Sequence, residues 1–155
     1  MKSNTKTFEI KHLTKEDLST FISLIDLFNL VFEEEPKIGS EANSLRLLDN
    51  DRFIAIVALA ENEIAGGLTA YELPMYYSES SEIFLYDLAV KPEYQRMGIG
   101  KGLIQSLKEH CIKKGIKEFF VMAHEEDEHA IEFYRVTGGK AEKVVNFVYE
   151  LEAQS

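Results

Sequence analysis

The spacing of hydrophobic residues alternates between helical and strand patterns along the whole chain. Hydrophobic positions recur every three to four residues between Thr14, a predicted helix cap, and Pro36, which stops that helix. Further helices are predicted over 40–48, 98–114 and 126–137. Apolar runs typical of strands cover 8–11, 53–60, 64–73, 83–90, 117–123 and 143–151. This order predicts a mixed α/β fold, and because no linker interrupts it, we expect a single domain over residues 1–155.

Composition and charge exclude some classes of binding partner. The 155 residues include 27 Asp and Glu against 17 Lys and Arg, which gives a net charge of −10. A protein that binds duplex nucleic acid needs a basic face, so nucleic acid is not the expected partner, and the acidic surface favours cations. The longest apolar run, 53–60, is far shorter than the roughly 20 residues that cross a bilayer. We therefore expect no membrane partner.

The chain's start and its cysteine content point to a cellular compartment. The first twelve residues lack the apolar stretch of a secretory signal. Cys111 is the single cysteine, which excludes an internal disulfide and suits a reducing environment. A cytoplasmic location is expected. Cys111 lies on the apolar face of the predicted helix 98–114, where a core position is the favoured interpretation.

Glycines at the start of the predicted helix 98–114 indicate an anion site. Gly98 and Gly100 follow a buried strand that stops at Pro92, and they leave backbone N–H groups free at the positive end of the helix dipole. Arg96 and Lys101 add positive charge beside them. A pyrophosphate fits this arrangement, although the glycines by themselves also permit a purely packing role. The spacing differs from the Rossmann fingerprint, and no Walker A sequence is present.

Two motifs resemble those of the GCN5-related N-acetyltransferases (GNAT). Segment 95–100, QRMGIG, matches the Q/R-x-x-G-x-G/A motif that holds the acetyl-CoA pyrophosphate in that family. Segment 130–139, AIEFYRVTGG, is similar to the family's A-I-x-x-Y-x-x-x-G-F sequence, with Gly139 where Phe is usual. The resemblance implies a central mixed sheet of about six to seven strands, helices on both faces, and two splayed central parallel strands.

A closer likeness is to the type I aminoglycoside (gentamicin) 3-N-acetyltransferases. It is carried by YDLAV at 86–90, AYELP at 70–74 and the acidic cluster before Ala130. It implies acetyl transfer from the co-substrate acetyl-CoA to an amine of a cationic aminosugar, by direct attack in a ternary complex and without a metal. Members of the family often dimerise, so a homodimer is among the implied states.

The resemblance also assigns roles to individual residues. Asp87 is the expected group that orients the amine and accepts its proton, and Tyr134 is the expected proton donor to the leaving thiolate. A buried, satisfied carboxylate is the alternative interpretation of Asp87, and a core position is the alternative for Tyr134. Strand 83–90 is expected to splay from 119–123, and the backbone of 88–90 to bind the donor. The expected cofactor-binding residues are Leu88, Ala89, Val90, Gln95, Arg96, Met97, Gly98, Ile99, Gly100 and Lys101.

Substrate contacts are expected from carboxylates. The predicted set is Asp87, Glu125, Asp127 and Glu128, in preference to the run Glu33 to Glu35. A solvated face, or stabilisation of a helix start, is the alternative interpretation of the acidic cluster. His124 and His129 flank it without a third ligand at metal-site spacing, so no metal is expected.

Departures from the family pattern leave the acceptor open. Asp127 replaces the Asn that is common before Ala130, and His129 stands where the aminoglycoside branch often has Pro. A polyamine, another small amine or a protein amine is an alternative acceptor. A noncatalytic acyl-CoA-binding sensor is the alternative from another functional class.

Overall fold

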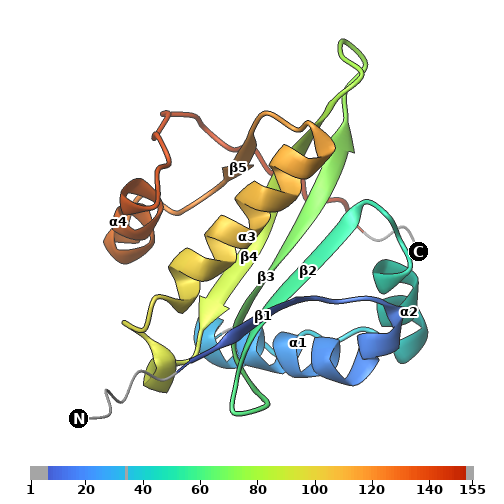
Figure 1. Ribbon diagram of the computed structural model, residues 1–155. Helices are drawn as coiled ribbons and strands as arrows, with labels where there is room; N and C mark the ends of the chain where they lie inside the picture. Colours follow the sequence, from blue (N-terminus) through green and yellow to red (C-terminus); the bar gives the residue numbers. More distant parts are fainter. Residues whose placement is uncertain (1–6, 34, 153–155) are drawn as a thin grey trace. The chain divides into compact units, whose positions relative to one another are not determined.

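The computed structural model describes residues 7–33 and 35–152, which form two compact units (Figure 1). The first unit ends at Met122 and the second begins at Ala123. The first unit contains β1 (Glu9–His12), α1 (Leu18–Phe32), α2 (Glu41–Leu48), β2 (Phe53–Ala60), β3 (Glu63–Pro74), β4 (Ser81–Val90), α3 (Ile99–Lys114) and β5 (Phe119–Val121). Two 3-10 turns, Lys15–Asp17 and Pro92–Tyr94, precede α1 and α3. The second unit contains α4 (Glu128–Val136).

The strands of the first unit form one mixed sheet in the order β1-β2-β3-β4-β5. Neighbouring strands are antiparallel except β4 and β5, which are parallel and are connected through α3. This arrangement confirms the predicted mixed α/β fold. The described residues contain five strands rather than the expected six to seven.

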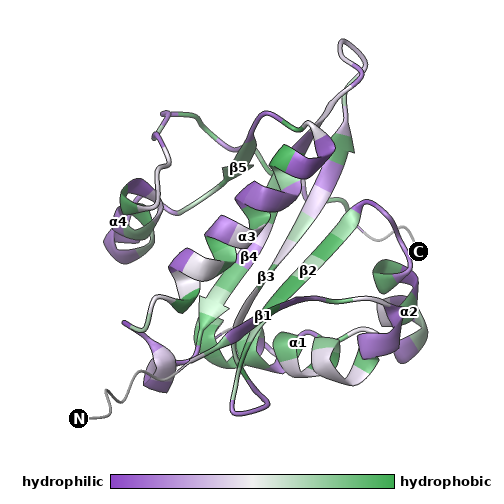
Figure 2. Ribbon diagram, in the orientation of Figure 1, coloured by the Kyte–Doolittle hydropathy of each residue, from purple (hydrophilic) through white to green (hydrophobic). Residues whose placement is uncertain are grey.

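Helices α1 and α3 cover opposite faces of this sheet. A Cβ placed on Gly66 would meet Ile99 of α3, whereas one on the next residue, Gly67, would overlap Leu24 of α1. Because successive residues of a strand point to opposite faces, the two helices lie on opposite sides of β3. Apolar colour concentrates on the central strands and polar colour on the outward surface of α3 (Figure 2).

Each face of the sheet has a hydrophobic core. On the α1 face, the buried cluster consists of Phe21, Leu24, Leu27, Phe28, Ala55, Val57, Ile64 and Ala89. On α3, the buried side chains are Ile99, Leu103, Ile104, Leu107 and Cys111. The core position expected for Cys111 is confirmed, and burial raises the pKa of its thiol.

Several predicted boundaries shift by a few residues for identifiable reasons. Thr14 caps the 3-10 turn Lys15–Asp17 in a capping box, so α1 begins only at Leu18. The Asp127 carboxylate accepts the N–H of Ala130 at 3.0 Å, which starts α4 at Glu128 rather than at residue 126. Pairing with β4 extends over three residues, which limits β5 to Phe119–Val121.

The predicted strand over 143–151 is wrong. The segment has no regular secondary structure, and its residues are exposed. A strand is defined by hydrogen bonds to a neighbour, and within the described residues this segment has no strand partner.

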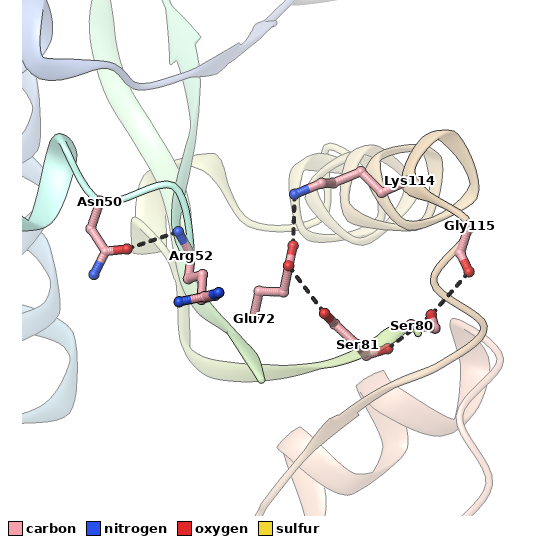
Figure 3. Close-up of polar contacts among 7 residues, drawn as sticks. All are labelled: Asn50, Arg52, Glu72, Ser80, Ser81, Lys114 and Gly115. Atoms are coloured by element: carbon pink, nitrogen blue, oxygen red, sulfur yellow. Dashed lines mark hydrogen bonds and ion pairs between the residues drawn. The ribbon is translucent and has the colours of Figure 1, made fainter. Parts of the chain in front are cut away.

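A polar network joins the C-terminal end of α3 to the β3–β4 hairpin (Figure 3). Lys114 Nζ lies 2.7 Å from Glu72 Oε1, and Ser81 Oγ donates to Glu72 Oε2 at 3.1 Å. Ser80 Oγ donates to the carbonyl of Gly115 at 3.2 Å. Burial acts to raise the pKa of Glu72, but the hydrogen bonds and the Lys114 charge outweigh it and hold that pKa below its ordinary value. The ionised carboxylate is therefore the form that stabilises the fold.

Replacing Glu72 with Gln is expected to lower the free energy of unfolding by about 1 kcal/mol at neutral pH, since a charge-assisted hydrogen bond is lost at a partly exposed site. Because the pKa of Glu72 is lowered in the folded protein, its contribution is present above the unfolded pKa and is lost as the pH falls. Urea unfolding at pH 7 and at about pH 4 measures this, and the difference between variant and parent should shrink in acid. A difference independent of pH would contradict the assignment.

Candidate functional site

The loop between β4 and α3 exposes a row of backbone N–H groups. Gly98 caps α3 with φ of 80°, and the first helical hydrogen bond runs from the N–H of Gly102 to the carbonyl of Gly98 at 2.9 Å. The N–H groups of residues 98–101 therefore precede the helical ladder and have no intrahelical acceptor. Together with the helix dipole they form an anion-binding geometry.

Arg96 holds an unusual backbone conformation in this loop. Its φ of 65° is left-handed, a region that non-glycine residues rarely occupy. Such strain persists where the surrounding structure fixes it, often at functional sites. The side chains of Arg96 and of Lys101 in the first turn of α3 are both exposed. The loop thus carries positive charge beside the free N–H groups.

The other predicted loop residues have supporting positions. Gln95 Nε2 donates to the carbonyl of Val90 at 3.4 Å, which ties the loop back to the end of β4. Ile99 is 1% exposed and anchors the start of α3 on the sheet. Met97 is half-buried. Gln95 and Ile99 thus fix the loop and the start of α3 against the sheet.

Strand β4 loses its parallel neighbour partway along its length. Pairing with β5 covers Ile83 to Leu85, whereas β4 continues to Val90 and pairs there only with β3 among the described strands. The expected splay of the central parallel strands is confirmed. The edge of β4 from residue 86 to 90 leads directly into the loop at the start of α3.

The ladder alternation shows which β4 residues face this open edge. The N–H of Lys91 donates to the carbonyl of Ala65 on β3 at 2.8 Å. In an antiparallel pair the backbone groups alternate in direction, so Ala89 also faces β3, while Leu88 and Val90 face the open edge. Of the three predicted backbone contacts, the geometry directs those of Leu88 and Val90 outward and that of Ala89 into the sheet.

A β-bulge determines where Asp87 lies. Thr69 pairs with Asp87 and Ala70 with Leu85, so Tyr86 has no opposite residue on β3. Ala89 packs in the hydrophobic cluster on the α1 face, and Asp87, two residues before it on the strand, lies on the same face. The Tyr86 ring contacts Tyr71, which contacts Phe53, which in turn contacts Phe21 of α1, so Tyr86 also lies on the α1 face. The extra residue therefore brings Tyr86 and Asp87, adjacent in sequence, to the same face of the sheet.

Aromatic side chains form a row across this face. The ring centroids are 5.3 Å apart for Phe53 and Tyr71, 5.8 Å for Tyr71 and Tyr86, and 5.5 Å for Tyr86 and Phe84. Phe84 stacks on Phe120 of β5 at 4.8 Å. Tyr86 is 58% exposed, so part of the row is open to a ligand.

The aromatic row is electrostatically linked to Asp87. The pKa of Tyr71 is raised, first by burial and then by the charges of Tyr86 and Asp87. This row was not predicted from the sequence. The sequence does show two aromatic residues close together on β4, Phe84 and Tyr86. The strand register was needed to show that Tyr71 and Phe120 lie beside them in the same row.

The second unit holds the remaining predicted residues. Asp127 caps α4, and the neighbouring carboxylates Glu125 and Glu128 are exposed. The half-buried Tyr134 packs its ring against Phe133 at 5.2 Å, and its carbonyl accepts the N–H of Gly139 at 2.8 Å. The structure thus gathers Asp87, the open β4 edge and loop 95–101 in the first unit, and the acidic cluster with Tyr134 in the second.

An open polar depression lies at the other end of the β3–β4 pair. It has a volume of about 450 Å³ and is lined by Asp49, Asn50, Asp51, Arg52, Glu72 and Lys114. Glu72 pairs with Ile83, whereas the loop follows Val90, which pairs with Gly66. The depression is therefore separate from the loop site. Of the three candidates for substrate binding at the end of α1, Glu34 lies outside the described residues, and Glu33 and Glu35 are exposed.

The described part of the chain contains neither a metal-binding cluster nor a helix that could span a membrane. No cluster of three or more His, Cys, Asp or Glu side chains is placed to hold a metal ion. None of the helices in residues 7–33 and 35–152 combines the length and apolar character that a membrane span requires.

The comparison with known families matches residues 21–138 to the acetyltransferase (GNAT) family. The chain belongs to this family. It is similar to an aminoglycoside acetyltransferase from an uncultured soil metagenomic sample, meta-AAC0020, whose structure in complex with sisomicin is 43% identical. The alignment covers 94% of this chain and 97% of that one, with a TM-score of 0.90. The similar HMB0005 acetyltransferase is 36% identical over 94% of this chain and 99% of that one, with a TM-score of 0.89.

A curated relative of this GNAT chain is a thialysine N-epsilon-acetyltransferase from Sus scrofa. It is 33% identical over 75 residues, which span 46% of this chain and 44% of the relative. The chain therefore matches less than half the length of that relative.

Proposed function

We propose that this GNAT chain is an acetyl-CoA-dependent N-acetyltransferase acting on an amine of an aminoglycoside-like cationic aminosugar. The observation that carries the proposal is the open β4 edge, which begins beside Asp87 and runs into the free N–H groups at the start of α3. Three places thus follow one another along the chain: one beside Asp87 for the amine, one along the β4 edge for the extended arm of the donor, and one at the start of α3 for its pyrophosphate. The similarity to aminoglycoside acetyltransferases at 36% to 44% identity supports the choice of acceptor.

The donor is assigned to the open edge and the loop. The pantetheine arm adds along β4 and hydrogen-bonds the backbone of Leu88 and Val90, as an added strand does. The pyrophosphate binds the N–H groups of residues 98–101, and Arg96 and Lys101 balance its charge. Ala89, Gln95, Met97 and Ile99 hold the strand and the loop in position.

The reaction is a direct transfer between two bound substrates. The amine nitrogen attacks the thioester carbonyl carbon, a C–N bond forms, and the C–S bond breaks as the tetrahedral intermediate collapses. A backbone N–H of the β4 edge stabilises the intermediate's oxyanion. Asp87 accepts the proton that the amine loses, and Tyr134 returns a proton to the thiolate of coenzyme A.

The acceptor is assigned to the acidic and aromatic groups. Asp87, Glu125, Asp127 and Glu128 attract a polycationic aminosugar, in agreement with the net charge of −10. Tyr86 presents an aromatic surface to an ammonium group on the same side of the sheet as Asp87, so the cation meets a π face and a carboxylate together.

A thiol-release assay tests the reaction and the acceptor. Acetyl-CoA is incubated with the protein and with sisomicin, gentamicin, spermidine, thialysine or a peptide amine, and free coenzyme A is measured. We expect turnover with the aminoglycosides. Turnover with thialysine or spermidine alone would favour a small-amine acetyltransferase, the alternative that the Sus scrofa relative supports. Acetyl-CoA binding without turnover on any amine would favour a sensor.

Replacing Tyr86 with Ala is expected to raise KM for the aminoglycoside about tenfold, the equivalent of one desolvated cation–π contact. The value of kcat should change less, because the substitution removes a contact made before and during the reaction alike. Tyr76, which is 99% exposed in the β3–β4 turn, gives the matched control Tyr76→Ala, for which KM should stay constant. Steady-state kinetics at varied aminoglycoside concentration measure KM for both variants. If Tyr86→Ala had the same KM as the parent protein, the aromatic row would not belong to the acceptor site.

A further inference from the structure

One stripe of α3 lies over the edge strand β1. A Cβ added to Gly102 would come within 3.0 Å of Phe8, which directly precedes β1. Four and eight residues further along the helix, Ser106 and His110 contact His12, the last residue of β1. Residues spaced by four lie on the same face of a helix, so these three positions of α3 form one contact stripe. Among the described strands β1 pairs only with β2, so packing against α3 is its second support.

Two histidines meet at the end of this stripe with few polar partners. The ring centroids of His12 and His110 lie 5.8 Å apart, and the ring planes are tilted by 31°. His12 Nε2 and Ser106 Oγ share a hydrogen bond of 3.0 Å. His110 Nε2 is buried and has no hydrogen-bond partner within the described residues. A neutral imidazole fits this contact because one of its ring nitrogens carries no proton, whereas a protonated ring presents two N–H donors and a positive charge.

The charges around His110 disfavour its protonation. Four ionisable side chains face it, one from β1, one from β3 and two from α3, namely His12, Glu72, Lys113 and Lys114. The carboxylate of Glu72 favours a protonated ring, but it already pairs with Lys114 Nζ at 2.7 Å. Burial, followed by the charges of His12 and Lys114, lowers the pKa of His110 below its ordinary value.

His12 has a similar environment. Partial burial of its ring against α3 lowers its pKa, Lys113 lowers it further, and Glu109 acts in the opposite direction. β2, which pairs with β1 beside His12, consists of apolar residues and supplies no countercharge. Both rings are therefore neutral at neutral pH.

We propose that His12 and His110 form a proton-sensitive latch, which holds β1 against α3 at neutral pH and opens in mild acid. Two neutral rings pack against each other and close the end of the stripe. Two protonated rings repel each other, and the buried Nε2 of His110 then carries a proton without an acceptor, which costs free energy until the contact opens to water. The latch does not depend on the proposed function, because it involves neither substrate.

The direction of the two pKa shifts sets the pH window of the latch. Because each pKa is lower in the folded chain than in the unfolded chain, the stabilising contribution is fully present above the ordinary histidine value of 6.5. It is lost as the pH falls below that value and through the lower folded values. The carboxylate of Glu72 titrates below this window, since its pKa is held under the ordinary value of 4.5.

Urea unfolding at about pH 7.5 and about pH 5.5 tests the latch. In the double variant His12→Gln and His110→Phe, the amide can keep a hydrogen bond to Ser106, the second ring keeps its packing, and neither side chain titrates. Between the two pH values, the unfolding equilibrium constant of the parent should rise about tenfold more than that of the variant. This is the effect of one histidine that stays neutral in the folded chain about one pH unit below its ordinary pKa.

The other two histidines of the chain give a matched control. His124 and His129 are exposed and belong to the second unit. The double variant His124→Gln and His129→Gln should keep the pH dependence of the parent. The proposal is overturned if the variant without His12 and His110 keeps that dependence, or if the control variant loses it.

Hydrogen exchange in the parent chain provides a second measurement that needs no variant. The N–H of Leu13, next to His12, donates to the carbonyl of Ala55 at 2.8 Å and reports on the end of β1. Its protection factor, which corrects for the intrinsic effect of pH on exchange, should fall about tenfold between the same two pH values. An unchanged protection factor would mean that β1 stays closed in mild acid, and it would reject the latch.

Discussion

Replacing Asp87 with Asn is expected to lower kcat for aminoglycoside acetylation by about 10² to 10⁴, the usual contribution of a positioned general base. Asn keeps the size of the side chain but cannot accept the amine proton. Because the donor is assigned to the backbone of Leu88 and Val90, the Kd for acetyl-CoA should stay within about twofold. Single-turnover kinetics and calorimetric titration with acetyl-CoA measure the two quantities separately.

Glu82 gives a matched control for the Asp87 variant. It is a carboxylate on the same strand, and it pairs with Leu73 at the end of β4 far from the loop. Glu82→Gln should leave kcat unchanged. An undiminished kcat in Asp87→Asn, at unchanged thermal stability, would remove Asp87 from the mechanism. An equal loss of kcat and of acetyl-CoA affinity would instead give Asp87 a structural role in the bulge.

Replacing Gly98 with Ala is expected to weaken acetyl-CoA binding by about 10- to 100-fold, the cost of losing one charge-assisted hydrogen bond. At φ of 80° an Ala side chain is strained, although the space around it is open. Relief of that strain rotates the peptide groups whose N–H groups are assigned to the pyrophosphate. Calorimetric titration with acetyl-CoA measures the effect.

Gly115 separates donor binding from backbone strain. It caps the other end of α3 with φ of 71°, and its surroundings are equally open. The substitutions Gly98→Ala and Gly115→Ala should therefore lower the free energy of unfolding by similar amounts, about 1 kcal/mol each. Only Gly115→Ala should keep full affinity for acetyl-CoA. If both variants bound acetyl-CoA equally well, or lost affinity equally, the N–H groups of residues 98–101 would not be the pyrophosphate site.

The sequence predicted most helices and strands closely because their signals are local. The apolar run at 53–60 is β2 without any shift, Ser40 caps α2 by accepting the N–H of Asn43, and Gly115 ends α3 in a left-handed conformation. Capping, glycine conformation and hydrophobic spacing each act within a few residues. The loop at 95–101 was predictable for the same reason, since its geometry depends on the chain next to it.

The positions of the groups that we assign to the acceptor were less predictable. The positions of Asp87 and Tyr86 depend on a bulge, and the bulge depends on how β4 pairs with β3. A regular strand would have placed these two neighbours on opposite faces, because side-chain direction alternates. The contribution of Tyr71 to the aromatic row depends on the same register.

The sequence by itself determined the order of elements, the glycine-containing loop at the start of α3 and the acidic net charge. The tertiary structure decided where β4 parts from β5, which face Asp87 occupies and whether 143–151 becomes a strand. The physical reason is that helices, caps and turns satisfy their hydrogen bonds within a short stretch of chain, whereas strands satisfy theirs only through a neighbour. The apolar pattern of 143–151 therefore predicted a strand, but the pattern alone does not supply the neighbouring strand that its hydrogen bonds need.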